Sequence, residues 1–348
     1  MQGIKKASLL LIISAVTAAI FFVSTGCGGG SKSSDQVLIN PVVKWTGNSG
    51  WPSDNHQSAG LIEFARRAKV ATDGRIEITV QVGGALGYKD SELIKAVQDG
   101  LVTVSDMMTS GVADAEPLFN IVTLPFLVQS LDEGKILNDT ASPYFAEVIE
   151  HKWGQKILYF SPWPPSGIWS KKEITEISDL KGLNTRTYDN NGNLVMQALG
   201  ATPFQLPFSE IYPSIVSGAI DSVMTSTPTA VDTKLWEVLN FYEPLNVMMA
   251  TDLVSINLKE FYKLDTETQN ILIKLGKDME AEMWNKVAKL DKDKEEVCNK
   301  NGIKTITPSK QLLNDLAVIT KNIRENWLKT APLEASTIVD EFNRKVGR

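Results

Sequence analysis

Arg186 closes a short β-type segment, residues 183–186, at the mouth of a strand-to-helix loop, where it is well placed to face a cleft. Turn-forming residues follow at 189–192, and a helix is expected from about Asn193. A guanidinium group offers paired N–H donors that match both oxygens of a carboxylate, and it stays charged at any relevant pH. The alternative is an ordinary surface arginine in a solvated ion pair. The local sequence alone leaves both interpretations open.

The stretch around this arginine, from Asp179 to Tyr212, resembles the solute-binding proteins of TRAP transporters (tripartite ATP-independent periplasmic transporters), the DctP family. The chain reads DLKGLNTR and then ALGATPFQLPFSEIYPSIVSGAIDS, where the family has DLKGLKIR and a similar ALGA…FsEvY run. Further matches lie at 83–100 (GGALGYKDSELIKAVQDG) and 123–127 (TLPFL). The resemblance covers nearly all of the chain after about residue 37 and puts Arg186 on the position that clamps the substrate carboxylate.

This resemblance implies an α/β, periplasmic-binding-protein-like fold: two α/β lobes with a ligand cleft between them and a long C-terminal helical region. Lobe I is expected at 37–161 and 248–290, and lobe II at 162–247 and 291–348. The implied function is capture of an organic acid by lobe closure and delivery to the membrane permease subunits of a TRAP transporter. No cofactor and no catalysis are implied, and the protein is expected to be a monomer.

The residue pattern itself predicts alternating strands and helices. Strands are expected at 37–44, 75–82, 102–108, 156–160 and 244–257, and helices at 58–71, 92–98, 266–299 and 311–329. Residues 45–52, rich in glycine and ending in proline, predict a loop. The βαβαβ order of the first five elements indicates a mostly parallel sheet, with ligands beyond the carboxyl ends of its strands.

The first residues are typical of an export signal. Lys5 and Lys6 precede an apolar run at 7–23, and small residues then lead to Cys27. This order predicts a lipoprotein signal peptide at 1–26, acylation of Cys27 and a flexible tether at 27–36, with the protein in the periplasm on a lipid anchor. The apolar run is at the lower limit of a membrane-spanning helix, so a membrane anchor is the alternative.

Charge and histidine content argue against several classes of protein. The formal charge is −6, and leaving out the two lysines of residues 1–26, which hold no acid, gives −8 for the rest. Such a balance argues against nucleic-acid binding. The two histidines, His56 and His151, have no metal-type partner at helical spacing, so a zinc site or a Ser-His-Asp triad is poorly supported.

Departures from the family pattern indicate the nature of the ligand. A second arginine, common in the crossing strand, is missing from 164–172, and Met, Trp and Thr replace charged positions. The predicted ligand-binding residues are Arg186, Thr225, Phe208, Asn48, Trp51, Met108, Thr109 and Trp163. For each tryptophan, packing in the core is the alternative.

A single carboxylate clamp among apolar walls favours one carboxylate on an apolar or aromatic body. We expect an aryl or indole-type monocarboxylate, or else a branched aliphatic keto or hydroxy acid. A sensor lipoprotein that presents an organic acid to a receptor would have the same fold and site, and the sequence does not separate it from a transport protein.

Overall fold

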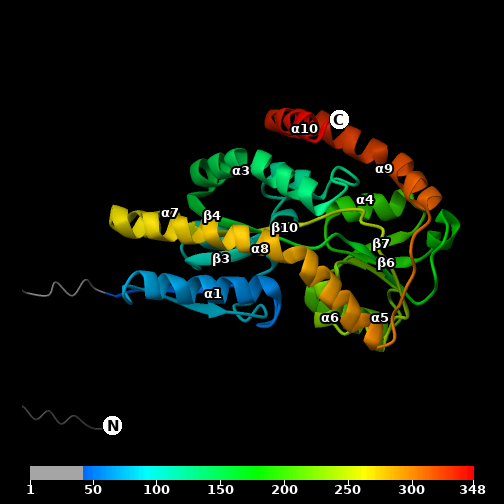
Figure 1. The fold of residues 1–348 in the computed structure, drawn as a ribbon, viewed down its shortest axis with the longest axis horizontal. Coiled ribbons are helices and arrows are strands. Elements are labelled where there is room, and N and C mark those ends of the chain that lie inside the picture. Colours follow the sequence, from blue (N-terminus) through cyan, green and yellow to red (C-terminus); the bar gives the residue numbers. More distant parts are fainter. Residues whose placement is uncertain (1–41) are drawn as a thin grey trace, which may run out of the picture. The chain divides into compact units, whose positions relative to one another are not determined.

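Two mixed sheets form the framework of the computed structural model, which describes residues 42–348. The first sheet has the strand order β2 (Ile76–Gln81), β1 (Val43–Asn48), β3 (Val104–Met108), β10 (Thr251–Asn257) and β4 (Gln155–Pro162). The second has the order β11 (Lys304–Thr305), β9 (Phe241–Glu243), β5 (Gly167–Ser170), β8 (Ser222–Thr225), β6 (Asn184–Thr187) and β7 (Thr202–Gln205). Each sheet with its helices is one lobe (Figure 1).

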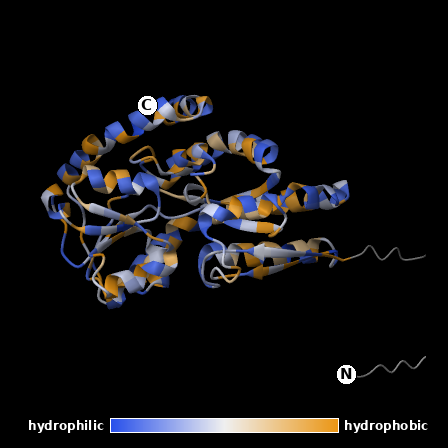
Figure 2. Ribbon diagram, turned by 180° about the vertical axis from the view of Figure 1, so that it is seen from behind, coloured by the Kyte–Doolittle hydropathy of each residue, from blue (hydrophilic) through white to orange (hydrophobic). Residues whose placement is uncertain are grey.

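Helices cover both sheets. They are α1 (His56–Ala71), α2 (Asp90–Gln98), α3 (Leu131–Trp153), α4 (Asn190–Ala198), α5 (Ile211–Val216), α6 (Thr227–Asp232), α7 (Leu258–Tyr262), α8 (Thr266–Lys300), α9 (Lys310–Thr330) and α10 (Leu333–Val346). Short 3₁₀ helices lie at Thr109–Gly111, Pro117–Thr123, Ile177–Leu180, Phe208–Glu210 and Leu235–Glu237. Hydrophilic and hydrophobic residues interleave along the outer helices (Figure 2), as expected for helices with one face on a core.

The directions of the strands decide which carboxyl ends lie at the same edge of a sheet. In the first sheet β1 is parallel to β2 and β3, whereas β10 runs antiparallel to β3 and β4. In the second sheet β6 is parallel to β7 and β8. The carboxyl ends of β1, β3 and β4 therefore lie along one edge of the first sheet, and those of β6, β7 and β8 along one edge of the second.

The long helix α8 (yellow to orange in Figure 1) serves both lobes. Near its start it lies against β4, where a Cβ on Gly276 would come within 2.0 Å of the carbonyl oxygen of Leu158. This close approach requires glycine. Farther along, Arg67 of α1 binds Glu282 at 2.6 Å, and Thr227 of α6 donates to Asp291 at 2.7 Å. The helix thus extends from the first sheet to the second.

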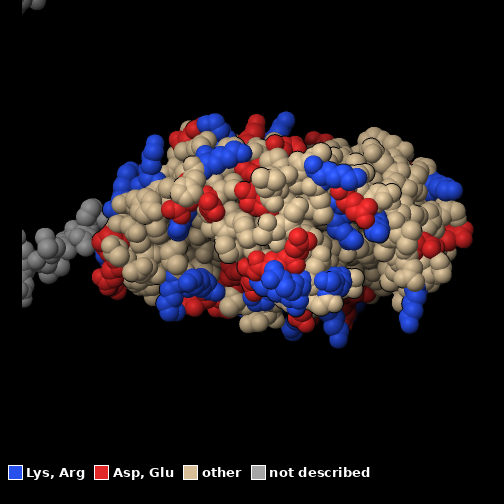
Figure 3. Space-filling model, turned by 90° about the horizontal axis from the view of Figure 1, so that it is seen from above, with Lys and Arg blue, Asp and Glu red and all other residues tan. Residues whose placement is uncertain are grey.

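The exposed faces carry charges of both signs, interspersed over the face seen in Figure 3. On α8, Lys274 pairs with Asp278 at 2.6 Å and Lys289 with Asp293 at 2.5 Å, both at the i, i+4 spacing. Such exposed pairs contribute a few tenths of a kcal/mol each (~0.3–0.5). They keep the outer face of the helix soluble and are not a site.

Most predicted elements are present, with corrections at their ends. The strand expected at 244–257 begins only at Thr251, because its first residues belong to a segment that runs between the two sheets. The prediction of a loop at 45–52 is wrong for residues 45–48, because β1 continues to Asn48 through pairing with β2 and β3. The turn expected at 189–192 is shorter, because α4 begins at Asn190 with Asp189 as its N-cap. The first strand residues expected, 37–41, and the export signal and Cys27 lie outside the described residues.

The C-terminal helices divide between the lobes. Helix α9 packs with α4, whereas Ala335, Ile338 and Phe342 of α10 join the core of the first sheet beside α3. The prediction assigned 291–348 as a whole to lobe II, so α10 differs from it. The apolar stripe of α10 indicates that one face of the helix is buried, but it does not indicate against which lobe.

Candidate ligand-binding site

Residues from both lobes meet where the parallel strands end. Trp51 follows β1, Met108 ends β3 and Trp163 follows β4. With Ala250 they form a buried apolar cluster, against which Tyr188, just after β6, and Phe208, just after β7, pack. The rings of Trp51 and Phe208 lie edge to face with centroids 5.5 Å apart. We call this group the aromatic cluster, and it joins the two lobes.

Arg186 adjoins the cluster from the second lobe. Only 4% of the residue is exposed, and its Nε donates to the carbonyl oxygen of Leu206 at 2.9 Å. Its guanidinium carbon lies 5.9 Å from the ring centroid of Tyr188. Within residues 42–348 its two terminal nitrogens make no hydrogen bond and no ion pair. The paired donors of this buried cation are therefore available to a ligand.

Desolvation by burial lowers the pKa of Arg186 to about 10, against the raising influence of Tyr188, Asp90 and Asp189. The cation therefore persists at neutral pH, but it carries a desolvation cost. An anion bound to it would offset that cost.

Asp90, in the first lobe, is near enough to Arg186 for each charge to act on the pKa of the other. It is exposed at the start of α2, next to Gly111, whose added Cβ would lie 3.0 Å from the Asp90 Cβ. Desolvation raises its pKa, and Arg186 acts in the opposite direction. No N–H donor binds its carboxylate among the described residues, so its oxygens remain free to accept hydrogen bonds.

Beneath the aromatic cluster lie two buried acids, Asp106 of β3 and Asp252 of β10. The indole N–H groups of Trp51 and Trp163 donate to the two oxygens of Asp252, at 3.1 and 2.7 Å. Ser49 donates to Asp106 at 2.7 Å. The two indoles are thereby fixed edge to face with ring centroids 4.7 Å apart.

The remaining predicted site residues make bonds within the protein. Asn48 donates to the Ser105 hydroxyl at 3.2 Å, and the hydroxyl of Thr109 donates to the carbonyl of Thr251 at 2.7 Å. Thr225 lies buried at the end of β8. The structure therefore brings Trp51, Met108, Trp163 and Phe208 together and places Arg186 beside them, while Asn48 and Thr109 are engaged elsewhere.

Sequence reasoning missed Asp90, Tyr188 and Asp252. Asp90 begins a helix, where an acid is ordinary, and Asp252 lies in a strand 146 positions after its partner Asp106. Only Tyr188 had a local signal, its position two residues after Arg186.

Two connecting segments join the lobes: residues 163–166, between β4 and β5, and residues 244–250, between β9 and β10. Trp163 and Ser166 on one segment donate backbone N–H groups to Ala250 and Met248 on the other, at 3.0 and 2.8 Å. Contacts on the open sides also join the lobes: Asn191 of α4 donates to the carbonyl of Asn120, and Asn55 donates to Asp232 at 2.6 Å. The described residues thus have the lobes in contact around the aromatic cluster.

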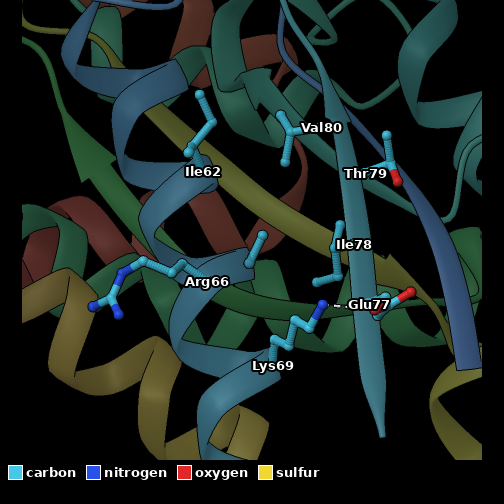
Figure 4. Close-up of a pocket in the computed structure, with 8 residues that line it drawn as sticks. Ile62, Arg66, Lys69, Glu77, Ile78, Thr79 and Val80 are labelled. Carbon is cyan, nitrogen blue, oxygen red and sulfur yellow. Dashed lines mark hydrogen bonds and ion pairs between the residues drawn. The ribbon is translucent and has the colours of Figure 1, made fainter. Parts of the chain in front are cut away.

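Two surface cavities lie away from this site. One, of about 540 Å³, is a groove between α1 and the edge strand β2, lined by Ile62, Arg66, Lys69, Glu77 and Val80 among others (Figure 4). The other, of about 180 Å³, lies at the connecting segments beside Pro165 and Asp291. Arg186 lines neither of them.

Among residues 42–348 there is no cluster of His, Cys, Asp and Glu that could hold a metal ion. The same residues include no helix that is both long and apolar enough to span a membrane.

The sequence model of the bacterial extracellular solute-binding proteins, family 7 (DctP), matches residues 47–330. The chain belongs to this family. Its members are solute-binding receptors of TRAP transporters and not enzymes, and they work outside the cytoplasm.

Solved structures and curated relatives agree with this assignment. The chain is 28% identical to DctP7, a Bordetella pertussis extracytoplasmic solute receptor binding pyroglutamic acid, with a TM-score of 0.84 over 87% of this chain and 100% of that one. It is 27% identical to a marine metagenome TRAP solute-binding protein specific for pyroglutamate, with a TM-score of 0.82 over 87% and 99%. A monocarboxylate 2-oxoacid-binding periplasmic protein of Nostoc sp. is 29% identical over 63% of this chain and 59% of its own length.

Proposed function

We propose that this protein captures a small organic monocarboxylate outside the cytoplasm and delivers it to the permease of a TRAP transporter. The observation that carries the proposal is Arg186, a buried cation whose terminal nitrogens make no bond within residues 42–348. Paired N–H donors of this kind match a carboxylate in a bidentate, charge-assisted contact. The two lobes close over the ligand, and ligand binding biases the hinge by the difference in affinity between closed and open states.

The body of the ligand meets the aromatic cluster and Asp90. Aromatic faces favour a flat or apolar body, whereas Asp90 favours an N–H donor close to the carboxylate. A small ring with both features, such as pyroglutamate, is our first candidate, and the solutes of the two similar receptors support it. A short 2-oxo acid, the solute class of the Nostoc relative, is the second.

An aryl or indole-type acid, the ligand expected from the sequence, is the competing candidate. The aromatic content of the cluster favours it. Against it stands the packing of the two tryptophans, which are 8% and 2% exposed and lie mostly on each other instead of on opposite sides of a slot.

A thermal-shift screen followed by calorimetry tests the proposal. Its panel contains pyroglutamate, a branched 2-oxo acid, indole acetate, succinate and glucuronate. Stabilisation by one or more of the first three supports a monocarboxylate site and ranks the candidates. Stabilisation by succinate or glucuronate alone would reject it.

The attachment to the membrane is proposed from the sequence alone. A signal peptide at 1–26, an acylated Cys27 and a tether at 27–36 would hold a monomeric receptor on the outer side of a bacterial membrane. Metabolic labelling with a fatty acid should mark the wild-type protein and leave Cys27→Ser unlabelled. A Cys27→Ser protein that is labelled equally would remove the anchor.

A further inference from the structure

The two tryptophans of the aromatic cluster depend on a single carboxyl group. Both oxygens of Asp252 accept an indole N–H, from Trp51 at 3.1 Å and from Trp163 at 2.7 Å. Asp252 itself is fully buried. Because an indole N–H can only donate, the orientation of both rings is set by where this acceptor lies.

A second acid is in contact with Asp252. Asp106 lies opposite Val254, so it is the diagonal neighbour of Asp252 on the same face of the sheet, and each of the two acids acts on the pKa of the other. One oxygen of Asp106, Oδ2, accepts from Ser49, and no N–H or O–H group of another residue among 42–348 donates to Oδ1. No Lys or Arg in that range pairs with either acid.

These contacts require a proton. Like charges buried side by side force one group to stay protonated, and a protonated carboxyl can donate where an ionised one can only accept. Desolvation raises the pKa of Asp106 to about 7, and desolvation together with Asp106 raises the pKa of Asp252 well above its ordinary value. One proton shared by the pair satisfies the otherwise orphaned Oδ1 of Asp106.

We propose that Asp106 and Asp252 are a positioning pair: one proton shared between them holds the indoles of Trp51 and Trp163 in the orientation that the ligand meets. Loss of the proton places two negative charges beneath the cluster, and mutual repulsion displaces Asp252 from its indole partners. Only the consequence for ligand affinity rests on the proposed function. The proton and its effect on the tryptophans are properties of the unliganded protein.

Other titratable groups lie around Asp106 and Asp252 and bear on how the pair responds to pH. Burial lowers the pKa of His56, which packs on Trp163, to about 4, and burial raises the pKa of Tyr159 in β4, so both are neutral near pH 7. Glu280 of α8 reaches β4 at the Phe160 amide at 3.0 Å. The charge of Asp90 raises the pKa of Asp106, so the titration includes an Asp90 variant as a control.

The test is an optical titration. Tryptophan emission and near-UV circular dichroism are followed from about pH 5 to about pH 9.5, below the pKa of about 10 of Arg186. The pair loses its first proton near the pKa of about 7 of Asp106 and its remaining, shared proton above that value. The wild-type protein should show a transition above the pKa of about 7 of Asp106, where the raised pKa of Asp252 lies and the shared proton is lost. Asp106→Asn should abolish it, because an amide accepts from Ser49 and donates to Asp252 at every pH.

Three variants serve as controls. Trp163→Phe should reduce the amplitude of the transition, because one reporter loses its bond to Asp252. Asp291→Asn removes a half-buried acid whose pKa is raised by desolvation to about 6, and it should leave the transition in place, as should Asp90→Asn. A flat wild-type profile overturns the proposal, and so does a transition that persists in Asp106→Asn. If Asp106→Asn does not fold, an unchanged amplitude in both Trp163→Phe and Trp51→Phe overturns it.

Ligand affinity supplies the second measurement, with pyroglutamate as the probe. The dissociation constant of the wild-type protein should rise about fivefold or more across the titration, the lower end of coupling between linked equilibria, and should stay nearly constant in Asp106→Asn. A pH-independent wild-type affinity would contradict the positioning role. If pyroglutamate fails to bind at every pH, that ligand is rejected, while the optical titration still decides on the pair.

Discussion

Arg186 is held by a single hydrogen bond, 2.9 Å from its Nε to the carbonyl oxygen of Leu206, the residue after β7. This bond uses the one guanidinium nitrogen that cannot take part in an end-on clamp and fixes the plane of the group. The terminal nitrogens are left without partners in the described chain. An arginine arranged in this way is prepared for a planar anion before the anion arrives.

The contact between the lobes at Asn191 predicts an effect on affinity without any contact to the ligand. Its amide donates to the carbonyl of Asn120 and to the hydroxyl of Thr123, both at 3.0 Å. Asn191→Ala should weaken the closed state by about 1–2 kcal/mol, since two bonds of ordinary strength are lost. Ligand affinity measured by calorimetry should fall correspondingly, because closure contributes to binding.

Asn193→Ala is the matched control for that experiment. Asn193 lies on the same helix but bonds within its own lobe, to Gln205 at 2.9 Å. It should leave affinity close to that of the wild-type protein. Equal losses in both variants would mean that damage to α4, and not the contact between the lobes, is responsible.

Gly276 predicts a large loss of stability on a small substitution. Its added Cβ would lie 2.0 Å from the backbone oxygen of Leu158, so Gly276→Ala must push α8 away from β4. We expect a loss of about 2 kcal/mol or more in the free energy of unfolding, measured by denaturant titration.

Gly60→Ala is the control for the helix position. The added Cβ there would meet the flexible end of Met283 at 3.2 Å, and alanine favours a helix over glycine by up to ~1 kcal/mol. Gly60→Ala should therefore be near neutral. A Gly276→Ala protein as stable as Gly60→Ala would show that the two elements are not so closely packed.

Glu243 predicts a pH dependence of stability. It is fully buried, and desolvation raises its pKa to about 7. A carboxyl group whose folded-state pKa is raised stabilises the fold below its unfolded pKa, and this contribution is lost as pH rises from about 4.5 to about 7. Glu243→Gln resembles the neutral acid at every pH. The free energy of unfolding of Glu243→Gln should equal that of the wild-type protein near pH 5 and exceed it by about 1–3 kcal/mol near pH 8.

Thermal unfolding of both proteins at the two pH values measures this difference. A gap that is the same at both values would show that Glu243 keeps one protonation state throughout.

The sequence predicted elements whose signal is local and missed those decided by partners far away in the chain. Helix α8 was foreseen within a residue at its ends because its charged and apolar residues repeat at helical spacing. Strand β1 was ended four residues early, since Gly47 and Asn48 are turn formers by type and become strand only through pairing with Val80 and Gln81.

The site divides in the same way. Arg186, Trp51, Trp163 and Phe208 were predicted from motif positions, and the structure groups the three aromatic residues. The acid pair beneath them could not be predicted, because Asp106 and Asp252 meet only when β10 inserts beside β3. Their pairing is a product of sheet order, which no local pattern encodes.

The central claim is that Arg186 clamps the carboxylate of the ligand, and the most direct measurement is calorimetric affinity for the best monocarboxylate of the panel in Arg186→Lys and Arg186→Ala. Arg186→Ala should lose about 2–5 kcal/mol of binding free energy, as for a buried charge pair that loses one partner. The affinity of Arg186→Lys should lie between those of the wild-type protein and Arg186→Ala, since the charge remains while the paired donors are lost. Affinity within twofold of the wild-type value in a folded Arg186→Ala protein would contradict the account.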